Sequence, residues 1–193
     1  DMALDQKLGR VALRIWIVGV LAAGVTLSMP PAMAEVSAAA VEISRADFRV
    51  ESDPEVEIFV REVAPQSETT GVSILLIHGG GPGGLASFDL EVPDYSLAAD
   101  FAKAGHQVYV MNVRGWEAST RPAGLDDPAE NNPPLVTSEE AMRDIDAVVD
   151  WIRDRTSQPM ALVGWATGGH WAGMYTSQNN EAVSHLVMLN SLY

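Results

Sequence analysis

Residues 160–169 read MALVGWATGG, and this stretch decides the fold class. Met160–Val163 is a short apolar run, typical of a strand that is buried on both faces of a sheet. Glycines at 164, 168 and 169 surround Ala166, which predicts a sharp turn leading into a helix over about 170–177. The stretch therefore predicts a strand–turn–helix unit, the building block of parallel α/β sheets.

Strand-like and helix-like segments alternate on both sides of this stretch. The predicted strands cover 41–50, 56–63, 72–77, 108–113 and 183–189, and a further predicted helix covers 96–103. The clearest helix begins at Thr137, which forms a capping box with Glu140 and precedes an apolar stripe of Ile145, Val148, Val149 and Ile152. Residues 116–136 contain four prolines and predict a loop. The alternation predicts an α/β fold, a mostly parallel sheet with helices on both faces.

The turn after Val163 has the spacing of a nucleophile elbow, Gly-x-Ser-x-Gly, with alanine in place of serine. Gly164 and Gly168 supply the small residues that the crowded backbone of such a turn requires. Ala166 stands at the nucleophile position and has no nucleophilic atom. Thr167 is one residue out of frame and β-branched, so we expect it to contribute a backbone N–H to an oxyanion hole instead.

A second glycine motif follows the predicted strand 72–77 and reads HGGGPGG over residues 78–84. Pro82 interrupts it and no lysine follows directly, so an oxyanion loop is favoured over a phosphate-binding loop. The backbone N–H of Gly80 is the expected oxyanion donor, with Gly81 as the alternative. We expect His78 to bond backbone in a structural role and His106 to be solvated.

Together these residues resemble the α/β-hydrolase superfamily, especially its proline-iminopeptidase-like branch. That branch has His-Gly-Gly-Pro-Gly after the third strand, which residues 78–84 match with one additional glycine. It also has Arg-Gly-x-Gly-x-Ser after the fourth strand, which residues 114–119 match except that Glu117 replaces the second glycine. The resemblance covers roughly residues 55–193 and implies an α/β-hydrolase fold.

The resemblance also implies acyl transfer, in which a serine at position 166 attacks a carboxylic ester or amide. The alternatives are a proline-iminopeptidase-like aminopeptidase and a non-catalytic pseudoenzyme or binding protein. Ala166 has two explanations: an engineered Ser→Ala substitution in an active enzyme, or a natural pseudoenzyme. The intact surroundings of the position favour the first.

The triad order in this fold is Ser, then Asp or Glu, then His. After Ala166 the sequence holds only His170 and His185, and neither lies on the expected loop. We therefore expect residues 35–193 to be the N-terminal part of the hydrolase domain. The acid and the histidine would come from a C-terminal half, which a separate chain could supply.

Trp165 and His170 flank the turn and are candidates for the substrate pocket, although aromatic residues at such positions are at least as often core. The positions three and four residues after His170 are Gly173 and Met174, so no metal site is expected there. No cofactor is expected, and the expected partner is a small-molecule ester or amide.

Residues 1–34 have the pattern of a signal peptide. Lys7, Arg10 and Arg14 precede the apolar run 15–27, and Ala32-Met33-Ala34 has the small-x-small spacing of a cleavage site. The run is shorter than the about 20 residues of a membrane span. We expect export to the periplasm or beyond, with no stable membrane anchor after cleavage; the alternative is an uncleaved anchor. The net charge of −14 disfavours nucleic acid as a partner.

Overall fold

A six-stranded sheet forms the centre of the structure, a computed structural model that describes residues 41–132 and 134–191. The strands are β1 (Ile43–Asp53), β2 (Val56–Pro65), β3 (Ser73–Ile77), β4 (Gln107–Met111), β5 (Met160–Trp165) and β6 (Val183–Leu189). The helices are α1 (Gly84–Phe88), α2 (Leu97–Lys103), α3 (Ser138–Thr156) and α4 (Thr167–Gln178). Short 3₁₀ turns occupy Ala123–Asp126, Ala129–Asn131 and Asn180–Ala182.

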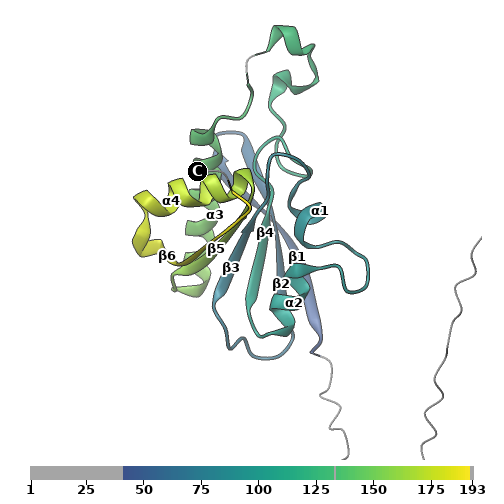
Figure 1. Ribbon diagram of the computed structural model, residues 1–193, viewed down its shortest axis with the longest axis vertical. Coiled ribbons are helices and arrows are strands. Elements are labelled where there is room, and N and C mark those ends of the chain that lie inside the picture. The colour runs from purple at the N-terminus through teal and green to yellow at the C-terminus, as the bar shows by residue number, and fades with distance from the viewer. Residues whose placement is uncertain (1–40, 133, 192–193) are drawn as a thin grey trace, which may run out of the picture. The chain divides into compact units, whose positions relative to one another are not determined.

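The strands lie in the order β1-β2-β4-β3-β5-β6 (Figure 1). β1 and β2 form an antiparallel hairpin, and β2 is also antiparallel to β4. β4, β3, β5 and β6 run parallel to one another. Because parallel strands end at the same edge of a sheet, the segments that follow these four strands meet at one edge.

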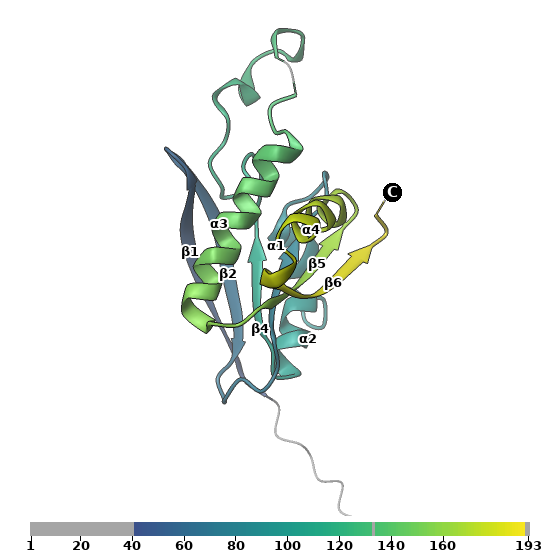
Figure 2. The same cartoon turned by 90° about the vertical axis from the view of Figure 1, so that its left-hand side faces the viewer.

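Successive residues of each strand face opposite layers, as the two-residue period of a strand requires. Leu75 and Ile77 of β3 pack in one core with α3 and α4, whereas Ile74 and Leu76 pack in the other with α1 and α2. Figure 2 shows the sheet from the side that α3 and α4 cover. The predicted α/β fold, with a mostly parallel sheet and helices on both faces, is confirmed.

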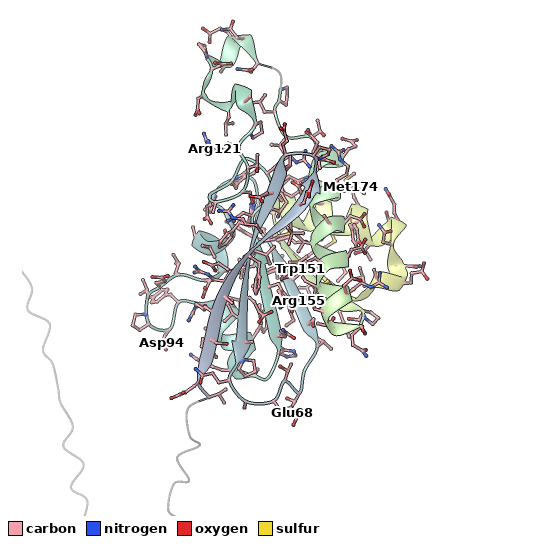
Figure 3. All side chains as sticks on the ribbon, turned by 180° about the vertical axis from the view of Figure 1, so that it is seen from behind. Glu68, Asp94, Arg121, Trp151, Arg155 and Met174 are labelled. Atoms are coloured by element: carbon pink, nitrogen blue, oxygen red, sulfur yellow. The ribbon has the colours of Figure 1, made fainter. Side chains whose placement is uncertain are left out.

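The predicted start of α3 is also confirmed. The Oγ1 atom of Thr137 accepts from the backbone N–H of Glu140 at 3.2 Å, and the Glu140 carboxylate accepts from the Thr137 N–H at 2.8 Å. The predicted apolar stripe of α3 is buried. Farther along the helix, the Arg155 guanidinium lies 4.6 Å from the ring centre of Trp151 and 5.0 Å from that of Phe48 in β1. Arg155 and Trp151 are labelled in Figure 3. This stack ties α3 to the hairpin.

The observed secondary structure differs from the predicted one in several places. α4 begins at Thr167 and not at about His170, because Gly168 and Gly169 lie inside its first turn. α1 was not predicted at all, since it spans only five residues and has no capping side chain of its own. The strand predicted over 108–113 ends at Met111, where the chain leaves the sheet.

The predicted signal peptide lies outside the described residues. Within residues 41–132 and 134–191, no helix combines the length and the apolar character that a membrane crossing requires.

Candidate active site

The two glycine motifs lie side by side at the carboxyl edge of the sheet. The loop of residues 78–84 follows β3, and the turn around Ala166 follows the neighbouring strand β5. The helices that come after them lie on opposite faces, since α1 and α2 pack in one core and α4 in the other. This is the switch point at which open α/β sheets bind their ligands.

The turn from β5 into α4 has a strained backbone at Ala166. Its φ is +51° and its ψ is −116°, a region that residues other than glycine rarely adopt. The Ala166 N–H donates to the carbonyl of Leu189 in β6 at 2.8 Å, and its carbonyl accepts from the N–H of Gly169 at 3.0 Å. This is the sharp strand-to-helix geometry that a nucleophile elbow uses to lift its central side chain off the sheet.

Glycine is required on both sides of this turn because backbone atoms occupy the space of a side chain. A Cβ on Gly164 would lie 2.4 Å from the carbonyl oxygen of Gly168. A Cβ on Gly168 would lie 2.3 Å from the carbonyl oxygen of His78. The crowding predicted from the sequence is thus present, and it presses α4 directly onto the loop that follows β3.

The structure places Gly80 beside the turn, whereas the side-chain position of Gly81 is open. A Cβ on Gly79 would lie 3.2 Å from the Cβ of Ala166, and a Cβ on Gly80 would lie 3.3 Å from Oγ1 of Thr167. A Cβ on Gly81 would meet nothing within 4 Å. Of the two candidate oxyanion donors predicted from the sequence, Gly80 is the one whose Cβ position lies against the Thr167 side chain.

His78 anchors the glycine loop through both ring nitrogens. Its Nε2 accepts from the backbone N–H of Val113 at 3.0 Å, so Nδ1 carries the proton and donates to the carbonyl of Gly79 at 2.6 Å. Burial lowers the pKa of His78, which favours this neutral form. The ring also packs against the rings of Trp116 and Trp171, with centres 5.1 and 6.3 Å away. The predicted backbone-bonding role of His78 is confirmed.

His106 is partly exposed, and it also bonds the backbone, which the sequence did not predict. Its Nδ1 accepts from the backbone N–H of Val72 at 3.2 Å, and its ring meets that of Phe101 edge to face. The partner lies 34 residues away in sequence, and no local pattern indicates that contact.

The two candidate pocket residues flank the elbow. Trp165 is half-buried and packs against the core that contains α1 and α2. His170 is half-buried in the first turns of α4. Trp171 and Tyr175 of the same helix are buried in the core with α3.

Asn112 and Glu117, which follow β4, complete the loop and were not recognised as site residues from the sequence. Asn112 Oδ1 accepts from the Gly84 N–H at 2.6 Å, and the Glu117 carboxylate accepts from the N–H groups of Leu85 and Ala86 at 3.3 and 3.2 Å. The departure of Glu117 from the family pattern was the one available signal.

Arg114 lies beneath this turn in a buried ion pair. Its guanidinium donates to Asp144 of α3 at 2.6 Å and to Asp53 of β1 at 2.7 Å, and its backbone N–H also donates to Asp144. The arginine of the family-like stretch therefore links β4, α3 and the hairpin.

Within the described ranges, no three His, Asp or Glu side chains gather in a way that could hold a metal ion.

Residues 73–192 match the model of the alpha/beta hydrolase fold family. Solved structures with the same fold include the thioesterase domain from the curacin biosynthetic pathway, with 20% identity and a TM-score of 0.59 over 77% of this chain and 47% of that one. DcsB, solved in complex with its substrate analogue, has 18% identity and a TM-score of 0.61 over 77% and 45%.

A third structure is 2-hydroxy-6-oxo-6-phenylhexa-2,4-dienoate hydrolase from Rhodococcus sp. strain RHA1, with 14% identity and a TM-score of 0.56 over 78% and 48%. The chain thus spans about half the length of these three proteins. No curated protein matches the sequence significantly. The strained turn, the glycine loop beside it and the family match over residues 73–192 lead to one conclusion: the chain belongs to the alpha/beta hydrolase fold family.

Proposed function

We propose that this chain carries the nucleophile elbow and the oxyanion hole of a serine hydrolase that cleaves a carboxylic ester or amide. The observation that carries the proposal is the backbone of Ala166, which is held at φ +51° at the carboxyl edge of the sheet. Such strain persists only where surrounding structure enforces it, and it clusters at active sites. Ala166 stands where the mechanism requires serine.

The proposed mechanism is acyl transfer. A serine hydroxyl at position 166 would attack the substrate carbonyl and form an acyl-enzyme, which water then hydrolyses. The backbone N–H groups of Gly80 and Thr167 would stabilise the oxyanion. Support for this pair comes from the position of Gly80, where an added Cβ would lie 3.3 Å from Oγ1 of Thr167.

The general base and its acidic partner are proposed to lie outside residues 41–191. Both ring nitrogens of His78 are occupied by backbone groups. His106 bonds Val72 beside the start of β4, and His185 pairs with Ala161 near the start of β6, so both lie away from the carboxyl edge. The proposal includes a C-terminal half that supplies these groups, and export directed by residues 1–34.

The experiment compares the full-length protein with its Ala166→Ser variant on a p-nitrophenyl ester. Loss of a triad serine costs on the order of 10⁶-fold in rate, so serine should raise hydrolysis by several orders of magnitude. A fluorophosphonate should label the variant at position 166 and leave the Ala166 protein unlabelled. Thr167→Ala can then be added to the Ala166→Ser variant. If labelling stays unchanged, the Thr167 side chain is not the nucleophile.

Two further outcomes separate the alternatives. Faster cleavage of amino-acid anilides than of esters by the Ala166→Ser variant would identify an aminopeptidase of the proline-iminopeptidase-like branch. If the folded variant hydrolyses neither substrate and takes no label, the hydrolase proposal fails. A non-catalytic binding protein, which the missing hydroxyl of Ala166 favours, then takes its place.

A further inference from the structure

The short helix α1 begins without a cap of its own. The first N–H groups of any helix lack partners inside the helix, and a side chain at the N-cap normally accepts one of them. Here the N-cap is Gly83, which has no side chain. Asn112 and Glu117 replace it: Asn112 accepts from the first N–H and the Glu117 carboxylate from the next two, those of Leu85 and Ala86. A turn that follows β4 therefore fixes the end of the glycine loop.

Glu117 is itself held in place from several sides. Its Oε2 accepts from the Asn112 side-chain amide at 3.0 Å. A Cβ on Gly83 would lie 2.5 Å from the Glu117 carboxyl carbon, so the absence of a side chain at 83 makes room for the carboxylate. The backbone of Glu117 has a φ of +40°, which favours glycine. The chain therefore keeps a glutamate where glycine would be less strained.

Trp116, which precedes Glu117, contacts the same loop at a second point. The indole N–H of Trp116 donates to the carbonyl of Gly81 at 2.9 Å. Trp116 and Glu117 thus hold the loop on both sides of Pro82, directly after Gly80. Figure 1 shows α1 beside the carboxyl end of β4, from which this turn emerges.

We propose that Glu117 is a positioning residue for the oxyanion hole, which acts by fixing residues 80–86 and thereby the N–H of Gly80. This inference rests on the proposed function, because the hole has a role only if an acyl group is transferred. An oxyanion donor must lie within about 2.7–3.1 Å of the developing charge, and loss of one costs on the order of 10²–10³-fold in kcat. Run 79–81 is all glycine, so it needs an external anchor to hold a donor that accurately.

The first test measures amide hydrogen exchange in the full-length Ala166 protein and needs no activity. Glu117→Gly removes the carboxylate and suits the positive φ, so it separates loss of the anchor from backbone strain. Glu117→Gln keeps one carbonyl acceptor. Exchange at Leu85 and Ala86 should rise at least tenfold in Glu117→Gly and less in Glu117→Gln. The Ala99 N–H in α2, which donates to the Ser96 hydroxyl at the N-cap, serves as the internal control, and its exchange should not change.

The second test repeats these variants with Ala166→Ser and measures ester hydrolysis. We expect Glu117→Gly to lower kcat by about 10- to 100-fold with KM changed less than threefold, and Glu117→Gln to recover part of the loss. The positioning role is overturned if only KM changes. It is also overturned if Glu117→Gln loses as much kcat as Glu117→Gly. Unchanged exchange at Leu85 and Ala86 overturns it as well.

The two proposals can fail separately. If Ala166→Ser alone gives no hydrolysis, the proposed function fails, and with it the role of Glu117 in an oxyanion hole. The exchange rates still decide whether Glu117 holds the loop. If Ala166→Ser is active and Glu117→Gly is equally active, the function stands and the positioning role is overturned.

Discussion

The backbone N–H of Ala166 donates to the carbonyl oxygen of Leu189 at 2.8 Å, which ties the most strained residue of the turn to the neighbouring strand. This bond helps to hold φ at +51° against the preference of alanine. We therefore expect Ala166→Gly to raise the free energy of unfolding by about 1 kcal/mol, because glycine adopts this region freely. Ala166→Val should lower it by at least as much, since a β-branched side chain fits a positive φ poorly. Urea unfolding measures both, and a destabilising Ala166→Gly would contradict the strain.

The close packing between the glycine loop and α4 gives a second prediction. Gly168→Ala places a Cβ 2.3 Å from the carbonyl oxygen of His78 and should cost about 3 kcal/mol in the free energy of unfolding. Gly81→Ala is the matched control, since its Cβ would meet nothing within 4 Å. It should change stability by less than about 0.5 kcal/mol. Similar losses in the two variants would mean that the loop and α4 are not packed as described.

The Arg114–Asp144 pair should be far more important for stability than an exposed ion pair. Both side chains are buried, so Arg114→Met leaves the Asp144 carboxylate without its partner, at a cost of about 3–5 kcal/mol. Asp144→Asn should cost less, because Asp53 still pairs with Arg114. Arg121→Met removes an exposed pair with Asp126 and should cost less than about 1 kcal/mol. Thermal unfolding of the three variants provides the comparison. A small loss at Arg114 would show that the hairpin and α3 are held together by other contacts.

The buried His78 predicts a loss of stability in mild acid. Burial lowers its pKa below the 6.5 of a free histidine, so below about pH 6.5 the unfolded chain binds a proton that the folded chain resists. The stability that neutral His78 contributes is fully present above that pH and is lost as the pH falls through the lowered pKa. We expect Tm to decrease between pH 7.5 and pH 5, and His78→Gln to remove part of that decrease. Equal decreases in the two proteins would contradict this role.

A separate loss is expected below about pH 4. Hydrogen bonds from Arg143 and Arg114 lower the pKa of Asp53, and those from Thr137 lower that of Glu140. Protonation of these carboxylates weakens the folded state only below their usual pKa values, so His78→Gln should retain this second loss.

The sequence predicted those parts of the fold that depend on neighbouring residues. The capping box of Thr137 and Glu140 and the apolar run of β3 carry their own signals, and both were confirmed. α1 could not be predicted, because its cap comes from Asn112 and Glu117, about 30 residues farther along the chain. The prediction placed the start of α4 too late because glycines disfavour helix formation. Here, however, close packing against His78 requires a glycine at position 168 inside the first turn of the helix.

In the candidate site, too, features that depend on neighbouring residues were predicted and those that depend on distant contacts were not. The elbow at Ala166 was recognisable from the spacing of its glycines, since that spacing reflects local crowding. Whether Gly80 or Gly81 faces Thr167 depended on how the loop after β3 lies against β5, which only the folded chain specifies. Glu117 was noticed as a departure from a pattern, and its contacts became visible only with the fold.

The proline-rich connection between β4 and α3 has a consequence for how the polypeptide is assembled. From Arg121 to Leu135, none of the described residues is buried, whereas β3, on the N-terminal side of this connection, pairs directly with β5 on its C-terminal side. The segments before and after this connection are therefore paired within one sheet and joined covalently only through a strip of exposed and half-buried residues. A single backbone cut within that strip would leave two fragments that share one core, and the elbow and its glycine loop would reassemble from separate pieces.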